Sequence, residues 1–151
     1  MAVRVQAADF DLGAELAALR AGRADIGALV SFTGLVRDAE GGESVSGLEL
    51  EHYPGMTERA LEEIEAEAHR RWPLKASLIV HRVGPLAPGE QIVMVATASA
   101  HRQAAFEAAE FLMDYLKSRA PFWKRETTPA GARWVDARTA DESALARWSG
   151  R

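Results

Sequence analysis

The chain has 151 residues, of which 48% are hydrophobic and 26% charged, and its formal net charge is −4. This composition is typical of one globular domain that folds without disulfides or a structural metal. The absence of cysteine excludes thiol nucleophiles, cysteine-bound zinc and persulfide chemistry on this chain. No run of about 18 apolar residues occurs, so we expect neither a signal peptide nor a membrane span, and a cytoplasmic location.

The first part of the chain predicts two strands around a helix. Residues 2–7 alternate as a short strand does, and Asp11 can cap a helix that ends at Gly22. The run 26–37 is apolar and rich in β-branched residues, which predicts a central strand of a sheet. The polar segment 38–46 after it predicts a loop.

The middle of the chain predicts three more strands and a second helix. Residues 47–53 alternate as a half-buried strand does, and the apolar stripe that follows predicts a helix from Thr57 to Trp72. The segments 75–84 and 90–99 predict two strands around a short turn. Such a pairing is typical of antiparallel sheets.

The last third predicts a helix over 101–118, strands over 122–127 and 132–138, and a short, frayed helix at 141–148. The resulting order is β-α-β-β-α-β-β-α-β-β-α. We therefore expect a single α+β domain over residues 1–151, with a largely antiparallel sheet and flanking helices.

The first candidate site lies where a predicted strand passes into the helix that begins near residue 101. A helix N-terminus offers unpaired N–H groups and partial positive charge, and His101 and Arg102 add side chains that bind anions. The alternative is an ordinary surface arginine beside a histidine in the capping region.

The second candidate site lies where that helix ends. Residues 115–125 carry four basic side chains and no acid, within a chain whose first 100 residues are net acidic. Lys117, Lys124 and Arg125 stand near aromatic residues, and Glu126 can orient one of them; lysines near apolar rings lose hydration, which favours nucleophilic or acid–base chemistry. Alternatively, Lys117 offsets the negative helix end and the others cover a solvated strand.

A weaker candidate is Arg37, which follows an apolar strand and precedes a glycine-containing loop. The histidines His52, His69 and His81 lack metal-ligand spacing, so we interpret them as structural. No nucleotide-binding or hydrolase motif of the common types occurs.

Long motifs follow one another from Gly27 to Arg138: FTGLVR, LELEHYPGMTERAL, HRVGPLAPGE, SAHRQAAFEAAEFLMDYLKSRAPFWKRE and RWVDAR. In this order they resemble the MoaE family, the catalytic (large) subunits of molybdopterin synthase. Residues 1–25 and 139–151 contribute little to the resemblance.

The resemblance implies an α/β-hammerhead-like fold and a sulfurtransferase of molybdenum cofactor biosynthesis. Such an enzyme puts two sulfurs onto cyclic pyranopterin monophosphate, forming the dithiolene of molybdopterin. The sulfur comes from the C-terminal Gly-Gly thiocarboxylate of a small ubiquitin-like partner, and the assembly is a heterotetramer around a homodimer of the large subunit. We expect no metal, no cofactor, no nucleic acid and no membrane among the partners.

The resemblance also assigns roles to residues. Lys117 is expected to be catalytic beside the terminal glycine of the partner, with Lys124 transferring protons or holding the pterin. The residues expected to bind substrate are Arg37, His101, Arg102, Lys117, Lys124, Arg125 and Glu126. The residues expected to line the pocket are Phe32, Leu35, Val36, Met113 and Arg138.

The length of the third helix places a limit on this site. Arg102 and Lys117 are 15 positions apart, which is roughly 22 Å along a helix axis. Both cannot easily contact one small ligand in a single chain. We therefore expect His101 and Arg102 of one subunit to complete the pocket of the other across a two-fold axis.

Two other functions are compatible with the sequence. The chain could only dock a ubiquitin-like tail and pass it on, without chemistry of its own. It could also bind RNA or nucleotides through the basic segment 115–125, with Phe122 and Trp123 as stacking platforms, although the net charge opposes this.

Overall fold

The computed structural model describes residues 2–40, 43–135 and 139–149. Its helices are α1 (Leu12–Arg20), α2 (Met56–Arg71), α3 (Arg102–Ser118) and α4 (Thr139–Ala146). Its strands are β1 (Val3–Gln6), β2 (Ala28–Leu35), β3 (Ala39–Glu40), β4 (Glu43–Ser44), β5 (Gly47–His52), β6 (Leu74–Arg82), β7 (Gly84–Leu86), β8 (Gln91–Ser99), β9 (Phe122–Thr128) and β10 (Gly131–Val135). The α+β class predicted from the sequence is confirmed.

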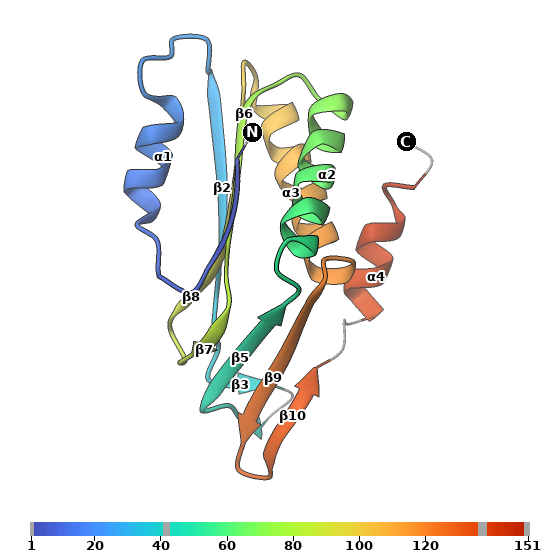
Figure 1. Cartoon of the computed structure of the whole chain (residues 1–151). Coiled ribbons are helices and arrows are strands. Elements are labelled where there is room, and N and C mark those ends of the chain that lie inside the picture. The colour runs from blue at the N-terminus through green and yellow to red at the C-terminus, as the bar shows by residue number, and fades with distance from the viewer. Residues whose placement is uncertain (1, 41–42, 136–138, 150–151) are drawn as a thin grey trace.

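The first sheet has the strand order β1-β6-β8-β2. Its pairs are antiparallel except for β1, which runs parallel to β6. Figure 1 shows α1 on one face of this sheet and α2 with α3 on the other. Because helices cover both faces, β6 and β8 are buried along most of their length.

Two apolar clusters fill the spaces between this sheet and its helices. The smaller cluster includes Phe10 and Met94 and lies against α1. The larger joins Val95 of the sheet to Leu61 of α2 and Leu112 of α3. Neighbouring residues of β8 belong to different clusters because side chains alternate between the faces of a strand.

The second sheet has the order β10-β9-β5-β7 and lies beyond the ends of α2 and α3 (Figure 1). Its strands are paired antiparallel, with β5 next to β9 from Gly47 opposite Thr127 to His52 opposite Phe122. Gly84 links the sheets: it follows β6 closely and starts β7 with a φ of 90°, a conformation that favours glycine. The site described below lies between the two sheets.

Two predictions about the strands are wrong. The run expected to be a central strand forms β2 at the edge of the sheet, where Phe32 and Leu35 are exposed. An apolar, β-branched run indicates a strand whose side chains are buried. It does not indicate whether the same chain or another chain buries them. The expected loop 38–46 contains the hairpin β3–β4, whose strands of two residues are too short to produce a periodic pattern.

The terminal helix α4 packs against α3 instead of fraying. Trp148, just after α4, is buried and makes edge-on contacts with Trp72 and Phe111. Its indole N–H donates a hydrogen bond of 2.6 Å to Asp114 of α3. A large aromatic side chain therefore fixes α4.

Across the ranges given above, no helix is both long and apolar enough to cross a membrane.

Candidate active site

A cavity of about 470 Å³ lies between the two sheets, next to the C-terminal end of α3. Its walls come from segments far apart in the chain. The lining residues are Leu35, Val36, Arg37, Ala39, Val45, Leu48, Leu50, His81, Ile92, Val93, Met113, Leu116, Lys117, Ser118, Ala120, Phe122, Trp123, Lys124, Glu126, Val135 and Asp141. Apolar side chains form much of the wall, and several charged groups converge on the same space, as in many small-molecule sites.

Both lysines expected to be catalytic lie in this cavity. Lys117 is in the last turn of α3 and is exposed, with its charge at the negative end of the helix. Lys124 is in β9, directly opposite Leu50 of β5, and is half-buried. The helix end and the strand therefore present two ammonium groups to one space.

The surroundings of Lys124 perturb its ionisation. Burial, followed by the positive charge of Lys117, lowers the pKa of the Lys124 ammonium to about 8. The negative charges of Asp141 and Glu126 act in the opposite direction. A lysine with this pKa is mostly protonated at neutral pH and can release its proton readily.

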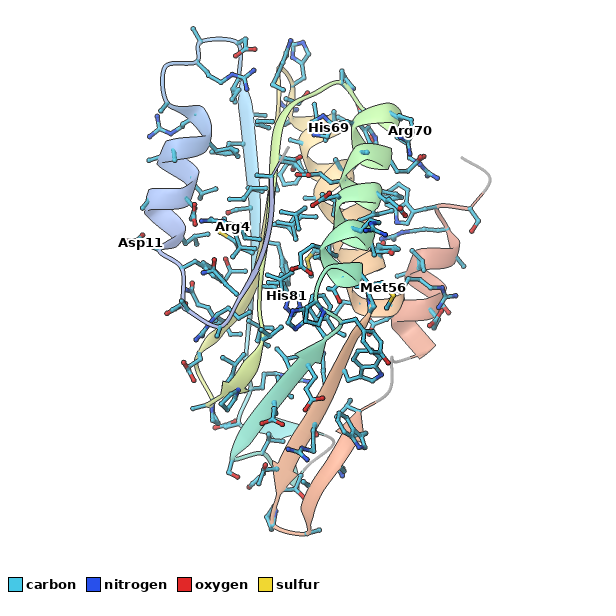
Figure 2. The ribbon with its side chains drawn as sticks, in the orientation of Figure 1. Arg4, Asp11, Met56, His69, Arg70 and His81 are labelled. Carbon is cyan, nitrogen blue, oxygen red and sulfur yellow. The ribbon has the colours of Figure 1, made fainter. Side chains whose placement is uncertain are left out.

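His81 lies at the junction of the two sheets, below α2 (Figure 2). Its ring stacks on Phe122 with centroids 3.8 Å apart, and its Nδ1 donates a hydrogen bond of 2.8 Å to the carbonyl of Arg82. Burial lowers the pKa of His81 to about 3, so the ring is neutral at physiological pH. His81 is a satisfied core histidine, as predicted, but it also forms part of the cavity wall.

Glu126 and Arg125 are neighbours on β9, yet only Glu126 lines the cavity. Glu126 is 7% exposed and lies 3.4 Å from the guanidinium of Arg133. Arg125 pairs with Glu49 at 2.7 Å, with its guanidinium 5.7 Å from the centre of the Trp134 ring. Alternation along the strand places these two side chains on opposite faces.

Some of the residues expected to line the pocket do line the cavity, and others do not. Leu35, Val36 and Met113 line the cavity, as does Arg37 of the predicted binding set. Phe32 is 41% exposed on β2 and is not among the residues that line it. Arg138 lies outside the described residues.

His101 and Arg102 lie at the opposite end of α3. His101 is the N-cap residue and Arg102 the first residue of the helix, and both are exposed. They line a separate, shallow depression with Gln103, Phe106 and Glu107. The structure therefore brings together Arg37, Lys117, Lys124 and Glu126 but not His101 or Arg102, as the length of the helix predicted.

This chain is similar to known proteins over most of its length. The family model for MoaE protein matches residues 5–119. The chain belongs to the MoaE family. It is 66% identical over 146 residues to the molybdopterin synthase catalytic subunit of Ralstonia nicotianae, covering 97% of this chain and 83% of that protein.

Solved structures with the same fold include the molybdopterin biosynthesis MoaE protein of Burkholderia ambifaria MC40-6. It matches with a TM-score of 0.85 and 62% identity over 100% of both chains. A complex of subunits 1 and 2 of molybdopterin-converting factor from Helicobacter pylori 26695 matches at 0.74 and 20% identity, over 90% of this chain and 91% of that one. This second likeness shows the fold alone.

The function of this MoaE chain is therefore that of a molybdopterin synthase catalytic subunit, a sulfurtransferase of molybdenum cofactor biosynthesis. Within the part of the chain that the structure describes, no cluster of three or more histidines or carboxylates could hold a metal ion.

Besides His81, sequence reasoning missed two polar residues of this MoaE cavity. Asp141 lies in α4, which was expected to fray, so no local pattern connected it with the lysines. Ser118 follows Lys117 directly, and its hydroxyl is buried with no hydrogen-bond partner among the described residues. Only the packing of α4 and the end of α3 reveals either group.

Proposed function

We propose that this chain transfers two sulfurs from the C-terminal thiocarboxylate of a small ubiquitin-like subunit to cyclic pyranopterin monophosphate. The observation that carries the proposal is the cavity in which Lys117 and the half-buried Lys124 converge with Arg37. Each transfer exchanges sulfur for oxygen: the thiocarboxylate becomes a carboxylate, and an oxygen on a pterin side-chain carbon is replaced by sulfur. No oxidant or reductant is consumed.

The two lysines take different parts in this exchange. Lys117, at the rim, stabilises the oxyanion that forms on the carbonyl of the terminal glycine. Lys124, whose pKa is about 8, donates a proton to the departing pterin oxygen as the bond between this oxygen and the side-chain carbon breaks. Arg37 and Glu126 hold the pterin, and the apolar wall near Leu48 and Leu50 excludes water.

This chain has no cysteine, so the sulfur has to come from another molecule, which in this proposal is the thiocarboxylated small subunit. A Gly-Gly tail is narrow enough to enter a cavity of about 470 Å³ that is open at Lys117 and Trp123, both of which are exposed. The Helicobacter pylori complex pairs a protein of the same fold with a second subunit, which agrees with such a partner. The cytoplasmic location expected from the sequence stays a prediction.

A second copy of the chain completes the active site in this proposal. β2 starts opposite Ser99, close to His101, and leads into Arg37 at the cavity. Its length of roughly 23 Å matches the roughly 22 Å between Arg102 and Lys117 on α3. If two copies meet along β2 in antiparallel fashion, the anion-binding end of each lies at the cavity of the other.

The surface along this edge fits such a contact. Phe32 and Leu35 of β2 are 41% and 55% exposed, and Phe106 of α3 is 60% exposed. Arg102, Phe106, Met113 and Lys117 fall within an arc of roughly 60° on α3, at 3.6 residues per turn. An exposed apolar strip along the open edge of a sheet is typical of a protein–protein interface.

The proposal is tested by incubating the purified chain with cyclic pyranopterin monophosphate and a thiocarboxylated small subunit. The dithiolene product is measured as its fluorescent oxidation derivative. We expect product with the thiocarboxylate and none with the carboxylate form of the partner. A stable complex that yields no product would contradict the proposal and favour a docking module.

A further inference from the structure

Asp141 brings a carboxylate to the cavity from the C-terminal part of the chain. It lies in the first turn of α4, is half-buried, and lines the cavity with Lys117 and Lys124. The function proposed above assigns it no role. Asp141 shares the cavity with the partly buried Lys124 and interacts with it electrostatically.

The helix that carries Asp141 is held firmly against α3. Arg147 bonds to Asp114 at 2.8 Å, and the Trp148 indole donates to the same carboxylate. At the other end of α4, Arg119 pairs with Glu142 at 2.7 Å. Contacts on both sides of the helix therefore fix the first turn, and with it Asp141, at the cavity wall.

The charged and titratable groups around Lys124 come from every element that borders this part of the cavity. They are Lys117 of α3, Arg37 after β2, Glu126 of β9, the neutral His81 of β6 and Asp141 of α4. The two cations disfavour the ammonium form of Lys124, and the two carboxylates favour it.

The two carboxylates are not equivalent. Glu126 already interacts with Arg133 across the β9–β10 pair, at 3.4 Å. Asp141 has no hydrogen-bond or ion-pair partner among the residues that the structure describes. Of the two carboxylates, Asp141 is therefore the one that no arginine of the described residues pairs with.

We propose that Asp141 is a positioning residue that stabilises the ammonium form of Lys124, keeping this lysine charged and able to donate a proton. The inference rests on the proton-donor role proposed for Lys124. Asp141 itself acts through Lys124 and needs no contact with the substrate.

The test measures the ionisation of Lys124 directly. The chain has three lysines, Lys75, Lys117 and Lys124, so the pH dependence of labelling by an amine-reactive reagent can be followed for each by peptide mass spectrometry. In Asp141→Asn we expect the labelling midpoint of Lys124 to fall by between a few tenths and about one pH unit. The exposed Lys75 is the internal reference.

Two variants control for a merely structural effect. Glu142→Gln removes a negative charge from the same turn of α4 but keeps a side-chain oxygen that can accept the hydrogen bond from Arg119, so α4 stays in place and we expect the Lys124 midpoint to stay unchanged. Asp141→Glu keeps the charge and should restore the midpoint. The pH profile of synthase activity should shift in the same direction in Asp141→Asn alone.

The result that overturns the inference is an unchanged Lys124 midpoint in Asp141→Asn, or an equal shift in Glu142→Gln. This outcome leaves the proposed function intact, provided that Lys124→Ala is inactive. An active Lys124→Ala enzyme would instead overturn the proton-donor role on which the inference rests.

Discussion

The two ends of α3 differ in how much of a binding site a single chain supplies. At the C-terminal end, Lys117 borders a cavity built from both sheets, α3 and α4. At the N-terminal end, His101 and Arg102 lie exposed in a depression lined by their own helix and its cap. One end is enclosed and the other is open.

The two ends of α3 therefore suit different chemical roles. The enclosed end desolvates an amine, which lowers the pKa of Lys124 and suits proton transfer. The open end offers an exposed guanidinium and an exposed imidazole, which suits it to complete a site on another molecule. If the two ends serve one active site, changes at either end, or along β2 between them, should lower activity.

The largest expected effect is at the enclosed end. Lys117→Ala removes the group assigned to the oxyanion and should lower the rate of product formation by about 100-fold or more. Affinity for the small subunit should change little, because the partner buries a much larger surface than one side chain. Kinetics and binding measured on the same preparation check both statements.

The matched control is Lys75→Ala, which removes an exposed lysine of β6 outside the cavity. It should leave the rate unchanged. Equal losses of activity and of partner affinity in Lys117→Ala would show that docking, not chemistry, explains this end of α3.

The next effect concerns the edge strand that connects the two ends. Phe32→Asp places a charge in the exposed apolar strip of β2 and should convert a dimer into monomers, with activity lowered about tenfold or more. Sedimentation at assay concentrations measures the oligomeric state. Trp134→Asp, at an exposed position on β10, is the control. A fully active Phe32→Asp monomer would contradict the shared site.

A smaller effect on activity is expected when the pH is raised. Because Lys124 donates a proton and its pKa is about 8, activity should fall as the pH rises through that value, to about one tenth at one unit above it. Lys124→Arg cannot lose its proton in this range and should show a low activity without this fall. An identical alkaline limb in both proteins would exclude Lys124 as its source.

The smallest effect concerns the packing that encloses the cavity. Trp148→Phe keeps an aromatic ring but removes the N–H that donates to Asp114. We expect a loss of about 1–2 kcal/mol in the free energy of unfolding, measured by denaturant titration. A loss below a few tenths would mean that this hydrogen bond does not hold α4 in place.

Much of this molecule could be predicted from its sequence, because the relevant signals are local. Helix α3 was predicted from its apolar spacing, and β6 and β8 from strand-forming runs around a short turn. The separation of Arg102 from Lys117 follows from helix length. Lys117, Lys124 and Glu126 were candidates because charged and aromatic residues alternate just past a helix end, and the structure places all three in one cavity.

The remaining features depend on tertiary packing. The edge position of β2 could not be predicted, because an apolar strand looks alike whether its own chain or another covers it. Asp141 reaches the cavity because contacts of Trp148, Arg147 and Glu142 hold α4 against α3. Arg125 points away from the cavity because the register of β9 places Glu126 inside.

The most direct test of the shared active site mixes two inactive variants. Arg102→Ala and Lys117→Ala chains are combined, allowed to exchange subunits, and assayed with the thiocarboxylated partner. Random exchange makes about half of the dimers mixed, and each mixed dimer has one intact site of two, so the account predicts about a quarter of wild-type activity. A mixture that stays inactive, although mass spectrometry shows mixed dimers, would contradict it.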